Sequence, residues 1–283
     1  MDELEWVDFL KKNIKKGKEV ISGIGDDCAL VRAGAESLLL KSDTFVEGTH
    51  FRRGDISLSR IGARAVARVF SDFAACGGRP LFAGISLGAG KREKAASIKR
   101  IMKGAEKFCR NHRCSLIGGD TTSSPFLFLD VWGVGKCGRF VPRSGARRGD
   151  YIFVTGKLGR LSFSDIFEPK IKEGLYLARR KGVHSMCDIS DGFFIDLYRI
   201  LKESKKGALL YGDCLDKLGR EKSLYRGEDY ELIFTVSKSC REAENLEKKF
   251  ILAGEIKPPS FGYRVKRGEV LSEVTVKGYN RLF

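Results

Sequence analysis

The sequence predicts a mixed α/β protein of the α+β type, built from two units that each combine strands with helices. Its 283 residues are enough for roughly two domains. Helix-like and strand-like segments are interspersed without the regular alternation of a doubly wound parallel sheet. The stretch VPRSGARRGD at 141–150 is rich in Pro, Gly and Arg, which is typical of a boundary loop. We therefore expect domains at residues 1–140 and 141–283.

The first unit is predicted to contain three helices and short β-like runs. The helices are expected near 4–15, 57–77 and 92–111, and the strands at 37–43 (SLLLKSD) and 126–135 (FLFLDVWGVG). The third helix illustrates the pattern, because Ile98, Ile101, Ala105 and Phe108 recur at helical spacing. Lys and Arg occupy the other positions, as on a solvated helix face.

The second unit opens with an apolar strand, YIFVTG at 151–156, and ends with several strand-like runs after Glu231. Helical patterns lie near 171–181, 192–203 and 238–248. The mixture of these elements again favours a mixed sheet over a parallel one.

Composition limits the partners and the compartment. The net charge is +16, and basic surfaces attract phosphates, but the Lys and Arg residues are dispersed along helices, which argues against nucleic acid as a partner. Eight cysteines without a CxxC or a Cys-His pair favour buried thiols over disulfides or zinc. No stretch approaches the roughly 18 apolar residues of a membrane span, and the acidic start MDELEWVDF lacks the order of a signal peptide. We expect a cytoplasmic protein that does not enter a membrane.

Six aspartates share a setting, because each follows or ends an apolar run and has small or hydroxyl neighbours. They are Asp27, Asp43, Asp72, Asp120, Asp188 and Asp191. If these ends converge, the carboxylates share one site, where two charges 4 Å apart repel by roughly 4 kcal/mol at an effective dielectric near 20. Such a cluster requires cations. Oxygen ligands without a Cys or His set favour Mg²⁺, which commonly bridges carboxylates to substrate phosphates.

The usual phosphate-binding loops are absent from the sequence. GAGKRE near Lys91 and GVGKCG near Lys136 lack the GxxxxGK spacing and the following Ser or Thr. GVGKCG has the bare spacing GxGxxG, which alone is a weak signal, and there is no HRD and DFG pair of a protein kinase. Phosphates would instead be held by metal, loop amides and a few basic residues.

The ordered set of segments resembles the signature segments of the thiamine-monophosphate kinase family. The segments are GIGDDCAL, SDTFVEGTHF, SDFAACGGRP, IGGDTT, RSGARRGD, TGKLG, DISDGFFIDL and GEDYELIF. The resemblance implies transfer of the γ-phosphoryl group of ATP to thiamine monophosphate, which gives thiamine diphosphate and ADP. It also implies a homodimer in which the N-terminal sheets form a β-barrel, followed by a C-terminal α/β layer domain.

The resemblance further implies roles for individual residues. The implied Mg²⁺ ligands are Asp27, Ser42, Asp43, Asp72, Asp120, Asp188 and Asp191, of which Asp27, Asp43, Asp72 and Asp120 are also expected to be catalytic. Gly119, Asp120, Arg143 and Ser190 match ATP-contacting positions, and His50, Glu228 and Tyr279 match positions that contact thiamine phosphate. ATP is a co-substrate, several Mg²⁺ ions take part, and a monovalent cation is a further option. Phosphoryl transfer depends mainly on alignment and charge neutralisation, so we expect direct transfer without a phospho-enzyme.

The chain departs from the family pattern at several positions. Lys41 stands where Ser or Thr usually adds a metal ligand, Val69 replaces the usual Asn, and Met102 replaces an aromatic residue. Arg226 replaces the first Gly of GGEDYEL, and the segment 159–169 is shorter than usual. These changes affect the substrate assignment more than the assignment of ATP and Mg²⁺.

Alternative interpretations remain open at this point. Gly-Asp pairs such as those at 23–27 also build surface turns. His50 could instead be a structural histidine. Glu228 could pair with Arg226, and Tyr279 could pack in the core. The whole chain has two alternatives: a sister ATP-using enzyme that makes aminoimidazole ribonucleotide or selenophosphate, or a degenerate, non-catalytic member that binds RNA or a protein.

Overall fold

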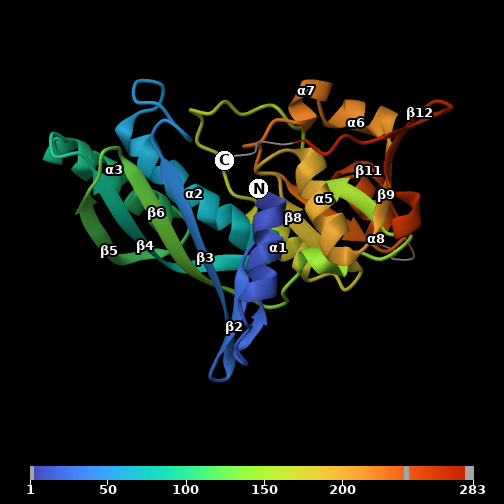
Figure 1. Cartoon of the computed structure of the whole chain (residues 1–283), viewed down its shortest axis with the longest axis horizontal. Coiled ribbons are helices and arrows are strands. Elements are labelled where there is room, and N and C mark those ends of the chain that lie inside the picture. The colour runs from blue at the N-terminus through green and yellow to red at the C-terminus, as the bar shows by residue number, and fades with distance from the viewer. Residues whose placement is uncertain (1–2, 239–241, 278–283) are drawn as a thin grey trace.

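The computed structural model describes residues 3–238 and 242–277, which form two sheets with helices packed against them (Figure 1). The strands of the first sheet are β1 (Val20–Ser22), β2 (Ala29–Ala33), β3 (Glu36–Val46), β4 (Gly78–Ala89), β5 (Ser115–Ser123) and β6 (Phe128–Cys137). Their spatial order is β1-β2-β3-β6-β4-β5, and only the β4/β5 pair is parallel among these neighbours. The sheet is therefore mixed, as predicted.

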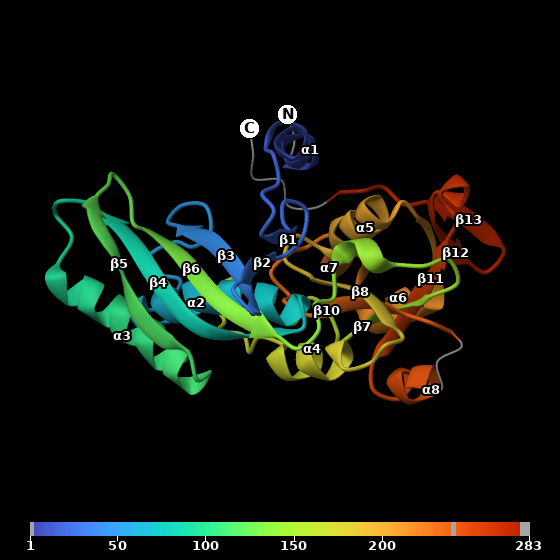
Figure 2. The same ribbon diagram turned by 90° about the horizontal axis from the view of Figure 1, so that it is seen from below.

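Two long helices cover one face of this sheet (Figure 2). The helices of this part are α1 (Glu3–Asn13), α2 (Leu58–Ala75) and α3 (Ala95–Asn111). Helix α2 begins after Ser57, whose hydroxyl accepts the N–H of Arg60 at 3.4 Å. Every residue of α2 from Ile61 onward is buried, because the helix lies between the sheet, α3 and the second unit. Such a helix is apolar around most of its circumference.

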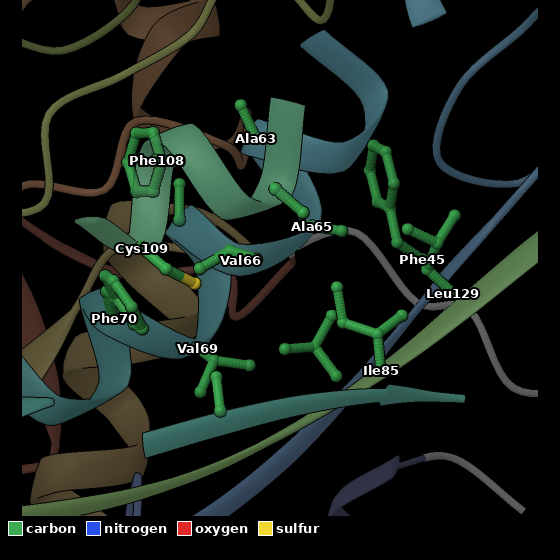
Figure 3. Packing of buried hydrophobic residues seen from close by; sticks show 14 of the residues in the cluster. Phe45, Ala63, Ala65, Val66, Val69, Phe70, Ile85, Phe108, Cys109 and Leu129 are labelled. Carbon is green, nitrogen blue, oxygen red and sulfur yellow. The ribbon is translucent and has the colours of Figure 1, made fainter. Parts of the chain in front are cut away.

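The core between α2, α3 and the sheet is aromatic and aliphatic (Figure 3). Phe70 of α2 lies with its ring centroid 5.9 Å from that of Phe108 of α3. Strand β6 alternates as a half-buried strand should, because Leu129 and Val131 are buried while Asp130 and Trp132 lie on the opposite, partly exposed face. We call this opposite face of the first sheet the open face.

The second sheet contains the strands β7 (Tyr151–Val154), β8 (Val183–Asp188), β9 (Gly207–Tyr211), β10 (Leu232–Val236), β11 (Ile251–Lys257), β12 (Tyr263–Arg267) and β13 (Val270–Glu273). Their spatial order is β13-β12-β9-β11-β7-β10-β8, and β12/β9 is a parallel pair in an otherwise antiparallel sheet. All five residues of β10 are buried, and the hydroxyl of Thr235 lies 2.8 Å from that of Ser185. The mixed α/β class is therefore confirmed in both sheets.

Helices cover both faces of the second sheet. They are α4 (Ile171–Ala178), α5 (Phe193–Ser204), α6 (Gly212–Leu218), α7 (Glu221–Leu224) and α8 (Glu242–Glu247), with 3₁₀ turns η1 (Arg143–Gly145) and η2 (Pro259–Phe261). Ile152 and Val154 pack in the cluster that contains residues of α5, whereas Phe153 packs in the cluster with residues of α4 and α8. This arrangement has three layers.

The predicted helices correspond to observed ones, with shifted ends. The helix expected at 92–111 begins at Ala95, because the N–H of Glu93 bonds the carbonyl of Gly90 in a turn. The helix expected at 238–248 corresponds to α8, and residues 239–241 lie outside the described part. The first sheet ends at Cys137 and the second begins at Tyr151, on either side of the predicted boundary at 140. The division into two domains stays a prediction.

A membrane-spanning helix is not found in residues 3–238 and 242–277, where no helix combines the necessary length and apolar character. The N-terminal helix α1 instead lies against α5, held by ion pairs. Asp8 accepts from Lys202 at 2.7 Å, and Lys11 pairs with Glu203.

The crossing of α2 and α3 provides a test of the core. A Cβ added at Gly104 would lie 1.9 Å from the Ser59 carbonyl oxygen, so the two helix backbones are in contact there. We expect Gly104→Ala to lower the free energy of unfolding by about 2–3 kcal/mol, because the helices must move apart. Gly138→Ala is the control, since no atom lies within 4 Å of its added Cβ. Equal denaturant midpoints for the two variants would contradict this packing.

Candidate active site

A cleft of about 510 Å³ lies between the two sheets, and it collects most of the predicted site residues. Residues from α1, β3, α2, η1, α5 and the loop after β8 contribute to it. The predicted residues that line it are Ser42, Asp43, His50, Asp72, Arg143, Asp188, Ser190 and Asp191. Asp27 adjoins it through an ion pair with Arg143. Residues from Glu3 to Tyr230 line this cleft, so segments far apart in the sequence meet at one site.

The two aspartates of the glycine turn at 23–27 have different hydrogen-bond partners. Asp26 accepts the backbone N–H of Arg143 at 2.7 Å and the Ser22 hydroxyl at 2.6 Å, so it ties the turn to η1. Asp27 accepts from the Arg143 guanidinium, with Nε 3.2 Å from Oδ2. Gly25 has φ +111°, which favours glycine. The turn interpretation fits Asp26, whereas Asp27 is turned toward the charged groups of the cleft.

Asp72 and Asp188 are buried carboxylates at the floor of the cleft. Asp72 lies in the last turn of α2, where the free carbonyls of a helix disfavour negative charge. Burial raises the pKa of Asp72 well above its usual range, and the Lys41 ammonium, 3.1 Å away, opposes this effect. Burial and the neighbouring Asp27 raise the pKa of Asp188 to about 6, although its Oδ2 accepts the Ser71 hydroxyl at 2.7 Å. Both carboxylates are stabilised in the ionised form by added cations.

Asp43 is held by Arg68, a residue that the sequence analysis missed. Arg68 Nε donates to Asp43 at 2.8 Å, and its Nη1 donates to Glu228 at 2.9 Å and to the Tyr230 hydroxyl at 3.0 Å. Burial opposes ionisation of Asp43, but Arg68 and Lys41 outweigh it and lower the pKa of Asp43. The available signal was the spacing, because Arg68 precedes Asp72 by four residues and so shares its helix face.

The loop of Ser190 and Asp191 is organised by Asp196, which was also missed. Asp196 Oδ2 accepts the N–H groups of Ser190, Asp191 and Gly192 at 3.0, 3.0 and 3.1 Å. Arg199 donates to Asp196 and, at 2.8 Å, to Asp191. This network fixes the start of α5 and the direction of the Asp191 carboxylate.

Ser42 and Asp43 lie on opposite faces of β3, because side chains alternate along a strand. Ser42 Oγ donates to Asp130 Oδ1 at 3.1 Å, and Thr44 Oγ1 donates to the same oxygen at 2.8 Å. These three side chains mark the point where the cleft reaches the open face. The role of Ser42 as a metal ligand beside Asp43 stays a prediction, and Asp130 is a further acidic group at the cleft.

Gly119 and Asp120 lie on the edge strand β5, and they are not among the residues that line the cleft. In register across the sheet, Asp120 pairs with Ser86, Ser86 with Asp130, and Asp130 with Thr44. Asp120 therefore shares the open face with Asp130. A Cβ on Gly119 would lie 1.8 Å from the Ile85 oxygen, which is a structural reason for glycine. Their ATP and metal roles stay predictions.

The three predicted substrate contacts have different surroundings. His50 lines the cleft, and its Nδ1 accepts the Val46 N–H at 2.9 Å. Glu228 is buried and pairs with Arg64 and Arg68. Tyr279 lies outside the described residues.

The loop around Glu228 is strained, since Glu228 and Tyr230 have φ of 72° and 53°. The segment 159–169 packs onto this loop, where the Phe167 ring stacks on Tyr230 at 3.7 Å. Arg226 donates to the Leu161 carbonyl at 2.6 Å. Strain and close packing of this kind are typical of functional sites.

The donor set fits Mg²⁺, because the acidic side chains at the cleft offer carboxylate oxygens from Asp27, Asp43, Asp72, Asp188 and Asp191. Asp27, Cys187 and Asp188 have potential ligand atoms within 4.8 Å of one another. Burial raises the pKa of the Cys187 thiol well above its usual range, and its Sγ donates to Asp27 at 3.6 Å. The thiol is therefore a hydrogen-bond donor here, and oxygen ligands dominate.

Comparison with known proteins agrees with this fold. Residues 25–137 match the family model of the AIR synthase related protein, N-terminal domain. The structure of AaThiL complexed with AMPPCP and TMP superposes with a TM-score of 0.79, at 28% identity, over 99% of this chain and 97% of that one. A HypE–HypF complex, at 19% identity and a TM-score of 0.75, shares the fold over 96% and 99% of the chains. The chain therefore has the AIR synthase-related fold.

Relatives that match most of the chain identify the family within this fold class. The thiamine-monophosphate kinase of Buchnera aphidicola subsp. Schizaphis graminum is 33% identical over 281 residues, which cover 86% of each chain. That of Escherichia coli K12 is 33% identical over 261 residues, covering 80% of this chain and 79% of the relative. The chain belongs to the thiamine-monophosphate kinase family, and this membership makes it a kinase.

The Asp196 network supplies a prediction for the site. Asp196→Ala leaves three loop N–H groups without their acceptor and removes one partner of Arg199. We expect it to lower the free energy of unfolding by about 3 kcal/mol. Asp55→Ala, at an exposed position, is the control and should change it by less than about 0.5 kcal/mol. Urea denaturation measures both, and a matching stability for the two variants would contradict the role of Asp196.

Proposed function

We propose that this protein transfers the γ-phosphoryl group of ATP to the phosphate of thiamine monophosphate, giving thiamine diphosphate and ADP. The observation that carries the proposal is the convergence of Asp27, Asp43, Asp72, Asp188 and Asp191 at one cleft. The family membership supports it, as does the AaThiL structure with AMPPCP, an analogue of ATP, and TMP. We also propose a cytoplasmic location, where ATP is available.

The proposed mechanism is direct in-line transfer. Bound Mg²⁺ ions would neutralise the charge that spreads over the moving phosphoryl group, and the five aspartates would hold them. Arg143 lies beside Asp27, and Ser190 lies on the loop that Asp196 orders, so both are positioned to orient the ATP phosphates. His50, at the β3 end of the cleft, is proposed to contact the acceptor. The acceptor phosphate is already ionised, so the reaction needs no strong general base.

A product assay with Asp72→Asn tests this proposal. The wild-type protein should form thiamine diphosphate in step with ADP, identified by mass, when ATP, Mg²⁺ and thiamine monophosphate are present. Asp72→Asn should lower kcat by at least about 100-fold, since it removes a charged ligand at the floor of the cleft. Asp216→Asn, which alters an exposed carboxylate paired with Arg267, should keep wild-type kcat.

Other outcomes of the same assay would distinguish the alternatives. ATP binding without thiamine diphosphate would favour a sister enzyme with another acceptor. Salt-sensitive binding of RNA without any ATP turnover would favour the non-catalytic alternative. Wild-type kcat for Asp72→Asn would contradict the metal-dependent mechanism.

We propose in addition that the protein is a homodimer paired through its open faces. In register across this face, Leu40 lies beside Val134, and Val134 lies beside Phe82. The Leu40 and Phe82 side chains are 38% and 43% exposed, and Ile117 on β5 is 57% exposed. A second copy packed on this apolar row would cover it and would bring Asp120 of β5 close to the interface.

The homodimer is tested with a charge on the open face. Phe82→Glu should give a monomer in sedimentation velocity at a concentration where the wild type is a dimer, because a carboxylate would be buried in the interface. Val270→Glu changes a more exposed residue, at 64%, on β13 of the other sheet and should leave the dimer intact. A dimer that persists in Phe82→Glu would contradict pairing through this face.

A further inference from the structure

Lys41 lies among the carboxylates of the cleft. It is two residues before Asp43 on β3, so the two side chains share one face of the strand. Its Nζ is 3.1 Å from Asp72 Oδ1, and its side chain is 25% exposed, toward the cleft that it lines. Asp43 and Asp27 are further carboxylates whose charges act on it.

Lys41 differs from Arg68 and Arg143, two of the basic residues that pair with the aspartates. The guanidinium of Arg68 also bonds Glu228 and Tyr230, and that of Arg143 also reaches the Gly25 carbonyl at 3.5 Å. Those two groups are therefore fixed by the protein on several sides. The lysine ammonium is a compact point charge on a flexible stem, which is the closest side-chain substitute for a small cation.

The chemistry of the lysine side chain adds a second argument. Lys41 carries a cation, whereas Ser or Thr at this position would supply a neutral oxygen ligand. An ammonium cannot act as a metal ligand, and it repels a cation bound at the same oxygen of Asp72. The same position therefore supplies a charge and removes a ligand.

We propose that the Lys41 ammonium takes the place of one divalent cation at Asp72, so that this chain binds one cation fewer per cleft than a variant with Thr at position 41. The expected effect of Lys41 on phosphoryl transfer rests on the proposed function, whereas the cation count does not. Lys41 acts through Asp72 and is thus a positioning residue. The remaining ions would be held by Asp72 and the other aspartates of the cleft.

The first measurement counts cations directly. Mn²⁺ is titrated into the full chain with saturating AMPPCP, and free Mn²⁺ is followed by electron paramagnetic resonance. Lys41→Thr should bind one more Mn²⁺ per chain than the wild type, and Lys41→Arg should bind the wild-type number. Lys136→Thr, at an exposed position of β6, is the matched control and should also bind the wild-type number. An unchanged count in Lys41→Thr, or an increase in Lys136→Thr as well, overturns the proposal.

A second measurement uses the Mg²⁺ dependence of the reaction. In Lys41→Thr the Mg²⁺ concentration for half-maximal rate should rise about tenfold, and kcat should recover at high Mg²⁺. A fall in kcat that Mg²⁺ does not restore would indicate a merely structural role and overturn the proposal. Since the Mn²⁺ count requires no turnover, an increased count without thiamine diphosphate would reject the proposed function alone. Product formation with an unchanged count would reject the role of Lys41 alone.

A neutral variant covers the case in which Lys41→Thr does not fold. Lys41→Met removes the charge without adding an oxygen ligand, and thermal unfolding checks that it is folded. It should weaken AMPPCP binding about tenfold at low Mn²⁺, while the Mn²⁺ count at saturation stays at the wild-type number. AMPPCP binding equal to that of the wild type would overturn the proposal.

Discussion

The balance of charge at the cleft is the constraint on which the rest of the structure depends. Asp27, Asp72 and Asp188 are all buried there, and burial together with neighbouring carboxylates opposes the ionisation of Asp72 and Asp188. Asp27 is matched by Arg143, and Asp72 is matched by Lys41. The Asp27 pair joins the first sheet to the loop before the second, so charge pairing also ties the two units together.

These groups add little to stability, because desolvation offsets much of the attraction in a buried ion pair. The positive φ values of Glu228 and Tyr230 add strain at the same place. The favourable free energy comes from apolar burial elsewhere, above all from α2, which is buried from Ile61 to its end. Helix α2 also carries Asp72 and Arg68, so this buried helix holds two charged side chains in place at the cleft that Tyr230 also lines.

The sequence was sufficient for the fold class and for most of the cleft. The β-like run at 126–135 predicted β6, and the aspartates that follow apolar runs at 72 and 188 do converge. The role of Arg68 could not be predicted from one chain, because an arginine within an apolar helix acquires its role only from the strand packed against it. Because side chains alternate along a strand, Ser42 and Asp43 point to opposite faces of β3. The sequence motif that contains both residues does not show this difference.

The pairing of Asp43 with Arg68 and of Asp72 with Lys41 affects ligand binding. Arg68 and Lys41 hold Asp43 and Asp72 in place through ion pairs, so the cleft is assembled by the chain's own charges. A divalent cation that binds Asp43 must compete with the guanidinium of Arg68, and one that binds Asp72 beside Lys41 is repelled by the ammonium. The nucleotide phosphates offer those two basic groups new anionic partners. Metal and nucleotide should therefore bind cooperatively, since each one supplies the charge that the other displaces.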